Sequence, residues 1–264
     1  MSDGGKMIKQ IIEQIKSTLS DQAVDYEKHI KDFGQVHANN ERMKGKTFNF
    51  REHIKGLIYA QLSNQRSWGP IARNLETINK IFCEYNPEVL KIQDPNHLEA
   101  QIVSIKCGNR KIASQLAKLR SNIETFEKIT LEYGNIDAFV TSDVPEKIAK
   151  ELGSGKKYKL KEIGFTLALE YLRNIGINAI KPDLHICRLI GPERLRFIDK
   201  IPTPEEAYHC LMDLEHEIPE SAVYLDNLLW IFAAKDYGNI CTANPKCNYC
   251  SVELCVMHPS GKRK

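Results

Sequence analysis

The sequence lacks any long apolar run, and neither sign of charge dominates it. No stretch approaches the roughly 18 consecutive apolar residues that suggest a membrane span, and the opening MSDGGKMIKQ contains no apolar signal core. We therefore expect an intracellular protein that does not enter a membrane. The formal net charge of only +3 excludes a polybasic tail or a histone-like protein.

Strand-like alternation, internal repeats and low-complexity linkers are also missing. Hydrophobic residues make up 42% of the 264 residues, which is enough to bury a substantial core. Gly69-Pro70, Pro145 and Pro204 are typical helix starts. We predict an all-α protein of about ten helices joined by short loops. Apolar residues recur at the three- and four-residue spacing of helices in MIKQIIEQIKSTL, FREHIKGLIYAQLS, GPIARNLETINKIFCEY, NRKIASQLAKLRSNIETFEKITLEY and PEEAYHCLMDLEHEI.

Positive charge gathers in a few short segments. A nearly neutral chain can still present one basic face to phosphates, and solvated surface is the alternative interpretation. The candidates are RMKGK at 42–46, KCGNRK at 106–111, GKKYKLK at 155–161 and GKRK at 261–264.

Half of the eight cysteines fall within one segment, CTANPKCNYCSVELC at 241–255. In a reducing compartment such a group is more often a metal site than a set of disulfides. Four thiolates can hold an iron-sulfur cluster or a tetrahedral zinc ion. The group consists of Cys241, Cys247, Cys250 and Cys255, whereas Cys83, Cys107, Cys187 and Cys210 lie in apolar segments typical of a core.

Two further segments have more than a helical pattern. Gly164 interrupts LKEIGFTLALEYLRNIG at 160–176 where a helix would begin, and backbone N–H groups at such a turn can receive a phosphate oxygen. In PDLHICRLIG, Asp183 directly precedes an apolar helix and is a candidate N-cap. A carboxylate in that place can also stabilise a cationic transition state or orient a water molecule.

The order of these motifs resembles the helix-hairpin-helix DNA glycosylases of the endonuclease III superfamily over roughly residues 45–255. The similarity rests on I-G before an apolar helix, P-D-x-H-I-x-R-L-I-G, and NLLWIFAAKDYG followed by clustered cysteines. LIYAQLSNQRS at 57–67 and IKCGNRK at 105–111 are similar to the family's two DNA-wedge loops. The resemblance implies a six-helix domain over 46–182 containing the hairpin. A second helical domain would combine 1–45 with 183–264.

The resemblance also implies the chemistry and the cofactor. A DNA glycosylase of this family binds double-stranded DNA, swings out a damaged or mismatched base and hydrolyses its N-glycosidic bond. Asp183 would face the cationic sugar, and the cysteines would hold a structural 4Fe-4S cluster, with zinc as the alternative. Their C-x5-C-x2-C-x4-C spacing is one residue shorter in both outer gaps than the endonuclease III pattern. The implied DNA-binding residues are Gln65 as the gap filler, Asn109, Arg110, Lys111, Lys161 and Gly164.

Several positions depart from the family pattern. Bifunctional members carry a lysine where this chain has Thr166, which points to a monofunctional enzyme that uses water. We expect the enzyme to be a monomer. The alternatives are a glycosylase and AP lyase with a displaced lysine (Lys159, Lys161 or Lys181) and a non-catalytic, structure-specific DNA-binding protein. Lys161-Glu162 replaces the usual P-G of the hairpin, and Ala60 argues against adenine removal. Trp68 and Tyr158 are candidates to stack on an extruded base, whose identity the sequence leaves open.

Overall fold

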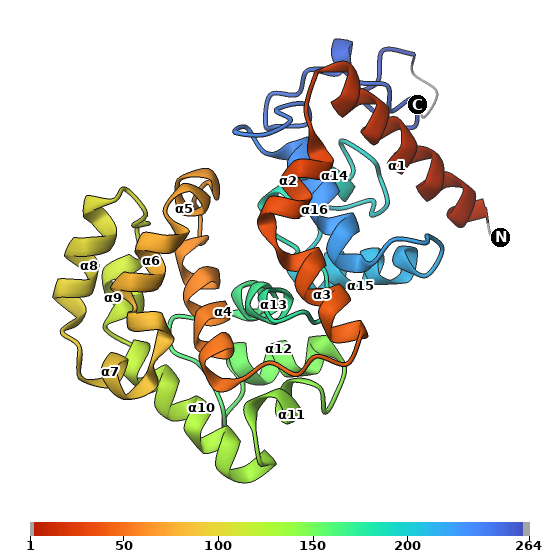
Figure 1. The fold of residues 1–264 in the computed structure, drawn as a ribbon. Helices are drawn as coiled ribbons and strands as arrows, with labels where there is room; N and C mark the ends of the chain where they lie inside the picture. The colour runs from red at the N-terminus through yellow and green to blue at the C-terminus, as the bar shows by residue number, and fades with distance from the viewer. Residues whose placement is uncertain (1–2, 261–264) are drawn as a thin grey trace. The chain divides into compact units, whose positions relative to one another are not determined.

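The computed structural model describes residues 3–260 (Figure 1). Every regular element in these residues is a helix, which confirms the predicted all-α class. No helix among them combines the length and apolarity that crossing a membrane requires. The basic segment 261–264 lies outside the described residues.

The described part of the chain contains sixteen α-helices and two short 3-10 helices, more than the predicted ten, partly because two long predicted helices are broken and partly because several further helices are short. The first breaks at Asn74, whose side-chain Nδ2 donates to the Pro70 carbonyl oxygen at 2.8 Å. An asparagine amide that binds nearby backbone competes with helix continuation. The second breaks at Ala117 and Lys118, after which a new helix begins.

The chain divides into two compact units, which we call the terminal unit (1–36 with 178–264) and the central unit (37–177). Helix α3 (Gln35–Met43) begins where the first part of the terminal unit ends. The terminal unit contains α1 (Asp3–Asp21), α2 (Tyr26–Phe33), α14 (Leu184–Ile190), α15 (Pro204–Glu215), α16 (Ala222–Ala233) and the 3-10 helix Cys247–Tyr249. The central unit contains α4 (Phe50–Leu62), α5 (Gly69–Arg73), α6 (Leu75–Ile81), the 3-10 helix Cys83–Tyr85, α7 (Pro87–Ile92), α8 (Pro95–Ser104), α9 (Ile112–Leu116), α10 (Leu119–Tyr133), α11 (Ile136–Val140), α12 (Pro145–Ser154) and α13 (Phe165–Asn174).

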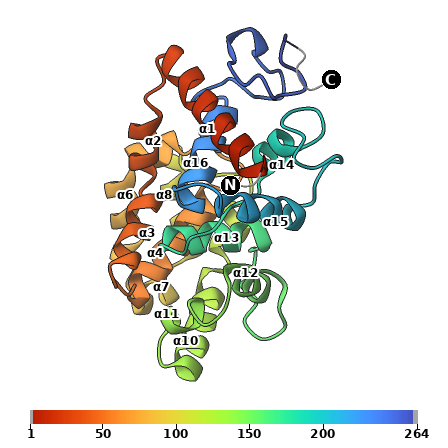
Figure 2. The same cartoon turned by 90° about the vertical axis from the view of Figure 1, so that its right-hand side faces the viewer.

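Helix α13 is the packing centre of the central unit, and Figures 1 and 2 both draw it beside α4 and α12. Its apolar face buries Ala168, Leu169 and Leu172. A glycine lets α12 approach the start of α13 closely, because a Cβ on Gly153 would lie 2.8 Å from the Phe165 backbone nitrogen. The two helices therefore form a tight pair.

A buried polar network ties α3, α4, α11 and α13 together within the central unit. Asp137 receives two hydrogen bonds from Arg42, at 2.6 and 3.1 Å, and one from His53 Nε2 at 3.1 Å. His53 Nδ1 lies 2.6 Å from the Tyr171 hydroxyl. Burial raises the pKa of Tyr171 well above its usual value, so its hydroxyl donates to a neutral imidazole. Arg42, predicted to belong to a basic surface segment, is instead a structural partner of Asp137, since its side chain is mostly buried.

Helix α16 forms the core of the terminal unit. It contacts α1, α2, α14 and α15, and its apolar residues from Ala222 to Ala233 are almost all buried. Beyond α16 the cysteine segment turns back onto α1, where the Ser251 backbone nitrogen donates to Thr18 Oγ1 at 2.9 Å.

Candidate active site and cysteine centre

Asp183 is the N-cap of α14, as the sequence predicted, and both of its carboxylate oxygens accept hydrogen bonds. Oδ1 accepts from the backbone nitrogens of His185 and Ile186 at 2.8 and 3.1 Å. Oδ2 accepts from the indole Nε1 of Trp230, on α16, at 3.1 Å. Three N–H donors and the positive end of a helix thus surround one half-buried carboxylate.

The segment that leads to Asp183 is fixed to α16. Asp226 accepts from the Lys181 backbone nitrogen at 3.0 Å, and the Asn178 side chain accepts from the Val223 nitrogen at 3.2 Å. Each contact joins a backbone N–H group to a side chain. These hydrogen bonds therefore hold the residues before Asp183 in place, although they form no helix or strand. The next residue, Leu184, is 82% exposed, which leaves an apolar side chain open beside the carboxylate.

His185 is the second residue of α14 and is neutral. Burial lowers the pKa of its imidazole below the usual value. Its Nδ1 lies 3.1 Å from Arg188 Nη2, and because a guanidinium only donates, Nδ1 is the acceptor. Arg188 also donates to the Cys241 carbonyl oxygen at 3.2 Å. Helix α14 therefore carries Asp183 at its start and contacts the cysteine segment from its later turns.

The hairpin between α12 and α13 is held by α10 of the same unit. Asn122, which is fully buried, donates to the Lys161 carbonyl oxygen at 3.1 Å and accepts from the Lys161 nitrogen at 2.6 Å. Glu162 adopts a left-handed conformation with a φ of 59°. Its carboxylate accepts from the Ser114 hydroxyl at 3.3 Å. Gly164 is exposed and extended, and a Cβ there would meet nothing within 4 Å.

The two loops that resemble the family's wedge loops lie side by side in the central unit. Arg66 in the first loop donates to the backbone carbonyls of Lys106 and Gly108 in the second. Asn109 donates back to the Gln61 carbonyl oxygen at 2.7 Å. Gln65, in the first loop, is exposed and has a φ of 52°. A non-glycine residue held at positive φ is uncommon and is often found at a functional turn.

The remaining predicted residues of the central unit have different environments. Arg110, Lys111 and Lys161 are exposed. Thr166 is half-buried in the first turn of α13. Trp68 is also half-buried, and its ring meets Tyr59 edge-on at a centroid distance of 5.7 Å.

Tyr158 does not present its ring to solvent. It is only 3% exposed, and its hydroxyl donates to Glu132. Phe139 and Tyr133 pack edge-on against its ring at centroid distances of 5.3 and 6.2 Å. The sequence placed an aromatic residue in the hairpin but did not reveal these partners, which come from α10 and α11.

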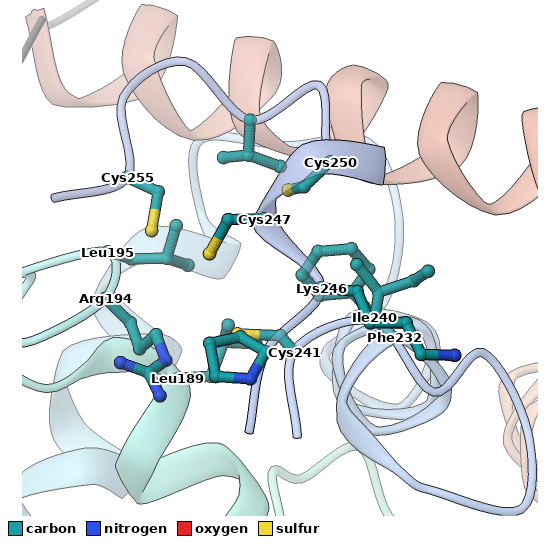
Figure 3. Close-up of a pocket in the computed structure, with 12 residues that line it drawn as sticks. Leu189, Arg194, Leu195, Phe232, Ile240, Cys241, Lys246, Cys247, Cys250 and Cys255 are labelled. Carbon is teal, nitrogen blue, oxygen red and sulfur yellow. The ribbon is translucent and has the colours of Figure 1, made fainter. Parts of the chain in front are cut away.

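The four clustered cysteines line one cavity in the terminal unit, and Figure 3 draws their thiols around a common space. Burial raises the pKa of Cys241 to about 12 and that of Cys250 to about 11. In residues 3–260, no three His, Cys, Asp or Glu side chains gather closely enough to hold a single metal ion.

A buried arginine stands at the edge of the cysteine cavity (Figure 3). Arg194 is 5% exposed, and its Nη1 donates to the Glu193 carbonyl oxygen at 3.0 Å. Its positive charge counteracts part of the burial effect on the pKa values of Cys241 and Cys255. A buried cation beside four thiols favours thiolates or another anionic group in this space.

Sequence reasoning missed the roles of Trp230, Asp226 and Asn122. Trp230 falls in an apolar helical pattern, so the pattern indicates a core residue and gives no sign of its bond to Asp183. Asp226 is the one carboxylate within the apolar run of α16 and was therefore a detectable anomaly. Asn122 lies in a polar stretch of α10, and no local signal marks it.

No protein-family model and no curated protein matches this chain. A solved structure that does match is the Methanocaldococcus jannaschii 8-oxoguanine glycosylase/lyase in complex with a 15mer DNA containing 8-oxoguanine. The likeness covers 84% of this chain and 95% of that chain, with a TM-score of 0.55 and 20% sequence identity. At 20% sequence identity, the similarity shows a shared fold and does not by itself show a shared activity. The chain therefore has the all-helical fold of that DNA glycosylase/lyase.

Proposed function

We propose that this chain is a DNA glycosylase that removes a damaged or mismatched base from double-stranded DNA and acts as a monomer. The observation that carries the proposal is Asp183, a carboxylate held at a helix N-terminus by three N–H donors in a chain with a glycosylase fold. Such an arrangement fixes the position and orientation of the carboxylate before the substrate arrives. A preorganised negative charge is how an enzyme stabilises developing positive charge.

The proposed reaction is hydrolysis of the bond between C1′ of the sugar and the base nitrogen. That bond breaks with its electron pair moving to the base, and the sugar gains oxocarbenium character. The Asp183 carboxylate stabilises this cation and orients the attacking water. The water oxygen bonds to C1′, and a water proton is transferred to the departing base. The products are a free base and an abasic site in an intact strand.

The central unit supplies the proposed DNA contacts. A base that leaves the stack requires a side chain to fill its place, and Gln65 is exposed for this role on a loop fastened by Arg66. At the hairpin, Gly164 leaves the backbone uncovered for a phosphate. Arg110, Lys111 and Lys161 add exposed positive charge near these two places in the sequence.

We propose a monofunctional reaction because the family's lysine position holds Thr166, which cannot form a Schiff base. A bifunctional reaction is the second candidate, since the M. jannaschii protein is named a glycosylase/lyase. Lys159 is one candidate for a displaced lysine, but its Nζ donates to the carbonyl oxygens of Gly153 and Ile163. A lysine engaged in this way is less available as a nucleophile.

We also propose that the four clustered cysteines hold a 4Fe-4S cluster with a structural role. Cys241, Cys247, Cys250 and Cys255 form a donor set of four thiols around one cavity, which fits such a group. Four thiolates on one zinc ion would lie roughly 3.8 Å apart, as Zn–S bonds of about 2.3 Å require. The resemblance to the endonuclease III superfamily favours a cluster over zinc, although the same four thiols could hold either. Bound there, the cluster would fasten the cysteine segment next to α14.

The test is a panel of duplexes that each carry one lesion: 8-oxoguanine, uracil, a thymine mismatch or an alkylated purine. Each product is examined with and without hot alkali, and Asp183→Asn is the matched control. The proposal predicts that at least one duplex treated with the wild-type protein breaks, and only after alkali. The same duplex treated with Asp183→Asn should stay intact after alkali, because no abasic site has formed. Cleavage without alkali, together with borohydride trapping of a protein-DNA crosslink, would establish the bifunctional candidate. No reaction on any duplex would reject catalysis.

A further inference from the structure

We propose that Trp230 is a positioning residue that sets the orientation of the Asp183 carboxylate. This inference rests on the proposed function, because it assigns Trp230 a part in the same reaction. It starts from the different ways in which the two oxygens of Asp183 are held. Oδ1 binds two backbone N–H groups of the helix that Asp183 itself caps. Oδ2 accepts a hydrogen bond from the indole of Trp230, which is 47 residues away in the chain.

This asymmetry makes the orientation of Oδ2 dependent on α16. The two cap bonds hold Oδ1, but the Cβ–Cγ torsion of aspartate is broad, so the carboxylate can still tilt about Oδ1 and move Oδ2. A hydrogen bond to Oδ2 removes this freedom. Charge-assisted hydrogen bonds are also stronger than neutral ones, so the indole N–H orients the anion while the rest of Oδ2 remains able to face a substrate.

The indole is itself held rigidly by aromatic neighbours. Phe33, Tyr237 and His185 meet its ring edge-on, with centroid distances of 5.7, 5.0 and 6.1 Å. Such edge-to-face contacts have a preferred geometry, so they restrict the indole as well as burying it. One turn before Trp230, Asp226 holds the backbone of Lys181. Helix α16 thus fixes both the main chain before Asp183 and one oxygen of its side chain.

The chemistry requires this orientation. A carboxylate lowers the barrier only when its charge is directed at the place where the sugar becomes cationic, and a misplacement of about 1 Å can cost on the order of a hundredfold in rate. Trp230 has no need to touch DNA for this role. Its loss should therefore slow the chemical step and leave the affinity for product-like DNA unchanged.

The experiment is a double-mutant cycle with Trp230→Phe, Asp183→Asn and the double variant. Single-turnover base release is measured on the lesion duplex found active, together with the Kd for a duplex containing a tetrahydrofuran abasic site. Trp230→Phe should lower the release rate about tenfold or more, the size expected for losing a hydrogen bond to a charged group, with the Kd within about twofold. In the Asp183→Asn background the same change should alter the rate by less than about twofold, because its effect passes through the carboxylate.

Two controls separate positioning from packing. Phe82→Leu removes a fully buried ring of the central unit and leaves the indole and its aromatic neighbours intact, so it should lower the Tm and keep the rate within about threefold. Benzothienylalanine at position 230 replaces the N–H by sulfur in a ring of nearly the same shape. It should reproduce the rate loss of Trp230→Phe at the wild-type Tm, which preserves the test if Trp230→Phe folds poorly.

The outcomes are distinguishable. Equal rate losses from Trp230→Phe in both backgrounds, or no loss in the wild type, would overturn the positioning role alone. A wild-type rate in Asp183→Asn would overturn the role of Asp183 in the proposed function and this inference with it.

Discussion

Replacing Gly153 with alanine should push α12 away from the start of α13. The added Cβ would lie 2.8 Å from the Phe165 nitrogen and 2.9 Å from the Gly164 carbonyl carbon, and these are backbone atoms that cannot rotate away. Overpacking of this kind costs about 1–3 kcal/mol. The better helix propensity of alanine offsets up to about 1 kcal/mol. We expect a net destabilisation of about 1–2 kcal/mol, which corresponds to a Tm lowered by about 2–8 °C at 2–4 °C for each kcal/mol.

Gly164→Ala is the matched control, since it adds the same methyl group eleven positions later. Its Cβ would meet nothing within 4 Å, and its φ of −104° suits alanine. The Tm should stay constant or rise slightly, whereas affinity for duplex DNA should fall, because the methyl group covers the proposed phosphate contact. Tm is measured by circular dichroism and affinity by fluorescence anisotropy. Equal Tm values for both variants would refute the packing argument, and unchanged affinity in Gly164→Ala would refute the contact.

Three further predictions concern other parts of the chain. Cys247→Ser should lower both the iron content per chain, measured after anaerobic purification, and the Tm. Cys210→Ser should change neither, because Cys210 lies outside the cavity. Stoichiometric zinc without iron in the wild-type protein would contradict the cluster. Gln65→Ala should slow base release from duplex more than from single strands, because a gap filler acts only where a stack exists; equal losses would remove that role. Burial lowers the pKa of His53, so its protonation favours the unfolded chain and the free energy of unfolding should decline as pH falls below about 6.5. Burial raises the pKa of Asp137, but hydrogen bonds from His53 and Arg42 outweigh it and bring the value to about 2, so a second decline should appear below pH 3.8. Denaturant titrations across pH check both declines, and His53→Gln should weaken the first; an unchanged profile would contradict the assignment.

Local signals predicted much of the fold. Helix periodicity and proline starts located α4, α12 and α15, and the P-D pair before an apolar run located the cap of α14. These features depend on neighbours a few residues apart, which a sequence displays directly. The broken helices were missed because a single side-chain bond, such as that of Asn74 to Pro70, interrupts a pattern that otherwise continues.

The parts of the site that the sequence did not reveal depend on distant partners. Trp230 and Asp183 are 47 residues apart, and Asn122 reaches a peptide 39 residues away. No spacing rule relates such pairs, because they meet only when the helices pack. The same reason explains Tyr158, whose ring is covered by residues from α10 and α11.

The most direct test of the central claim is the amount of free base that the protein releases from a lesion duplex, measured by mass spectrometry. Wild-type protein and Asp183→Asn are compared at equal concentration under single-turnover conditions, with binding to the duplex checked in parallel. The account predicts stoichiometric release by the wild type, and a rate about a hundredfold or more lower in the variant, with DNA binding retained. Release at the same rate by both proteins, or no free base from any duplex that the wild type binds, would contradict it.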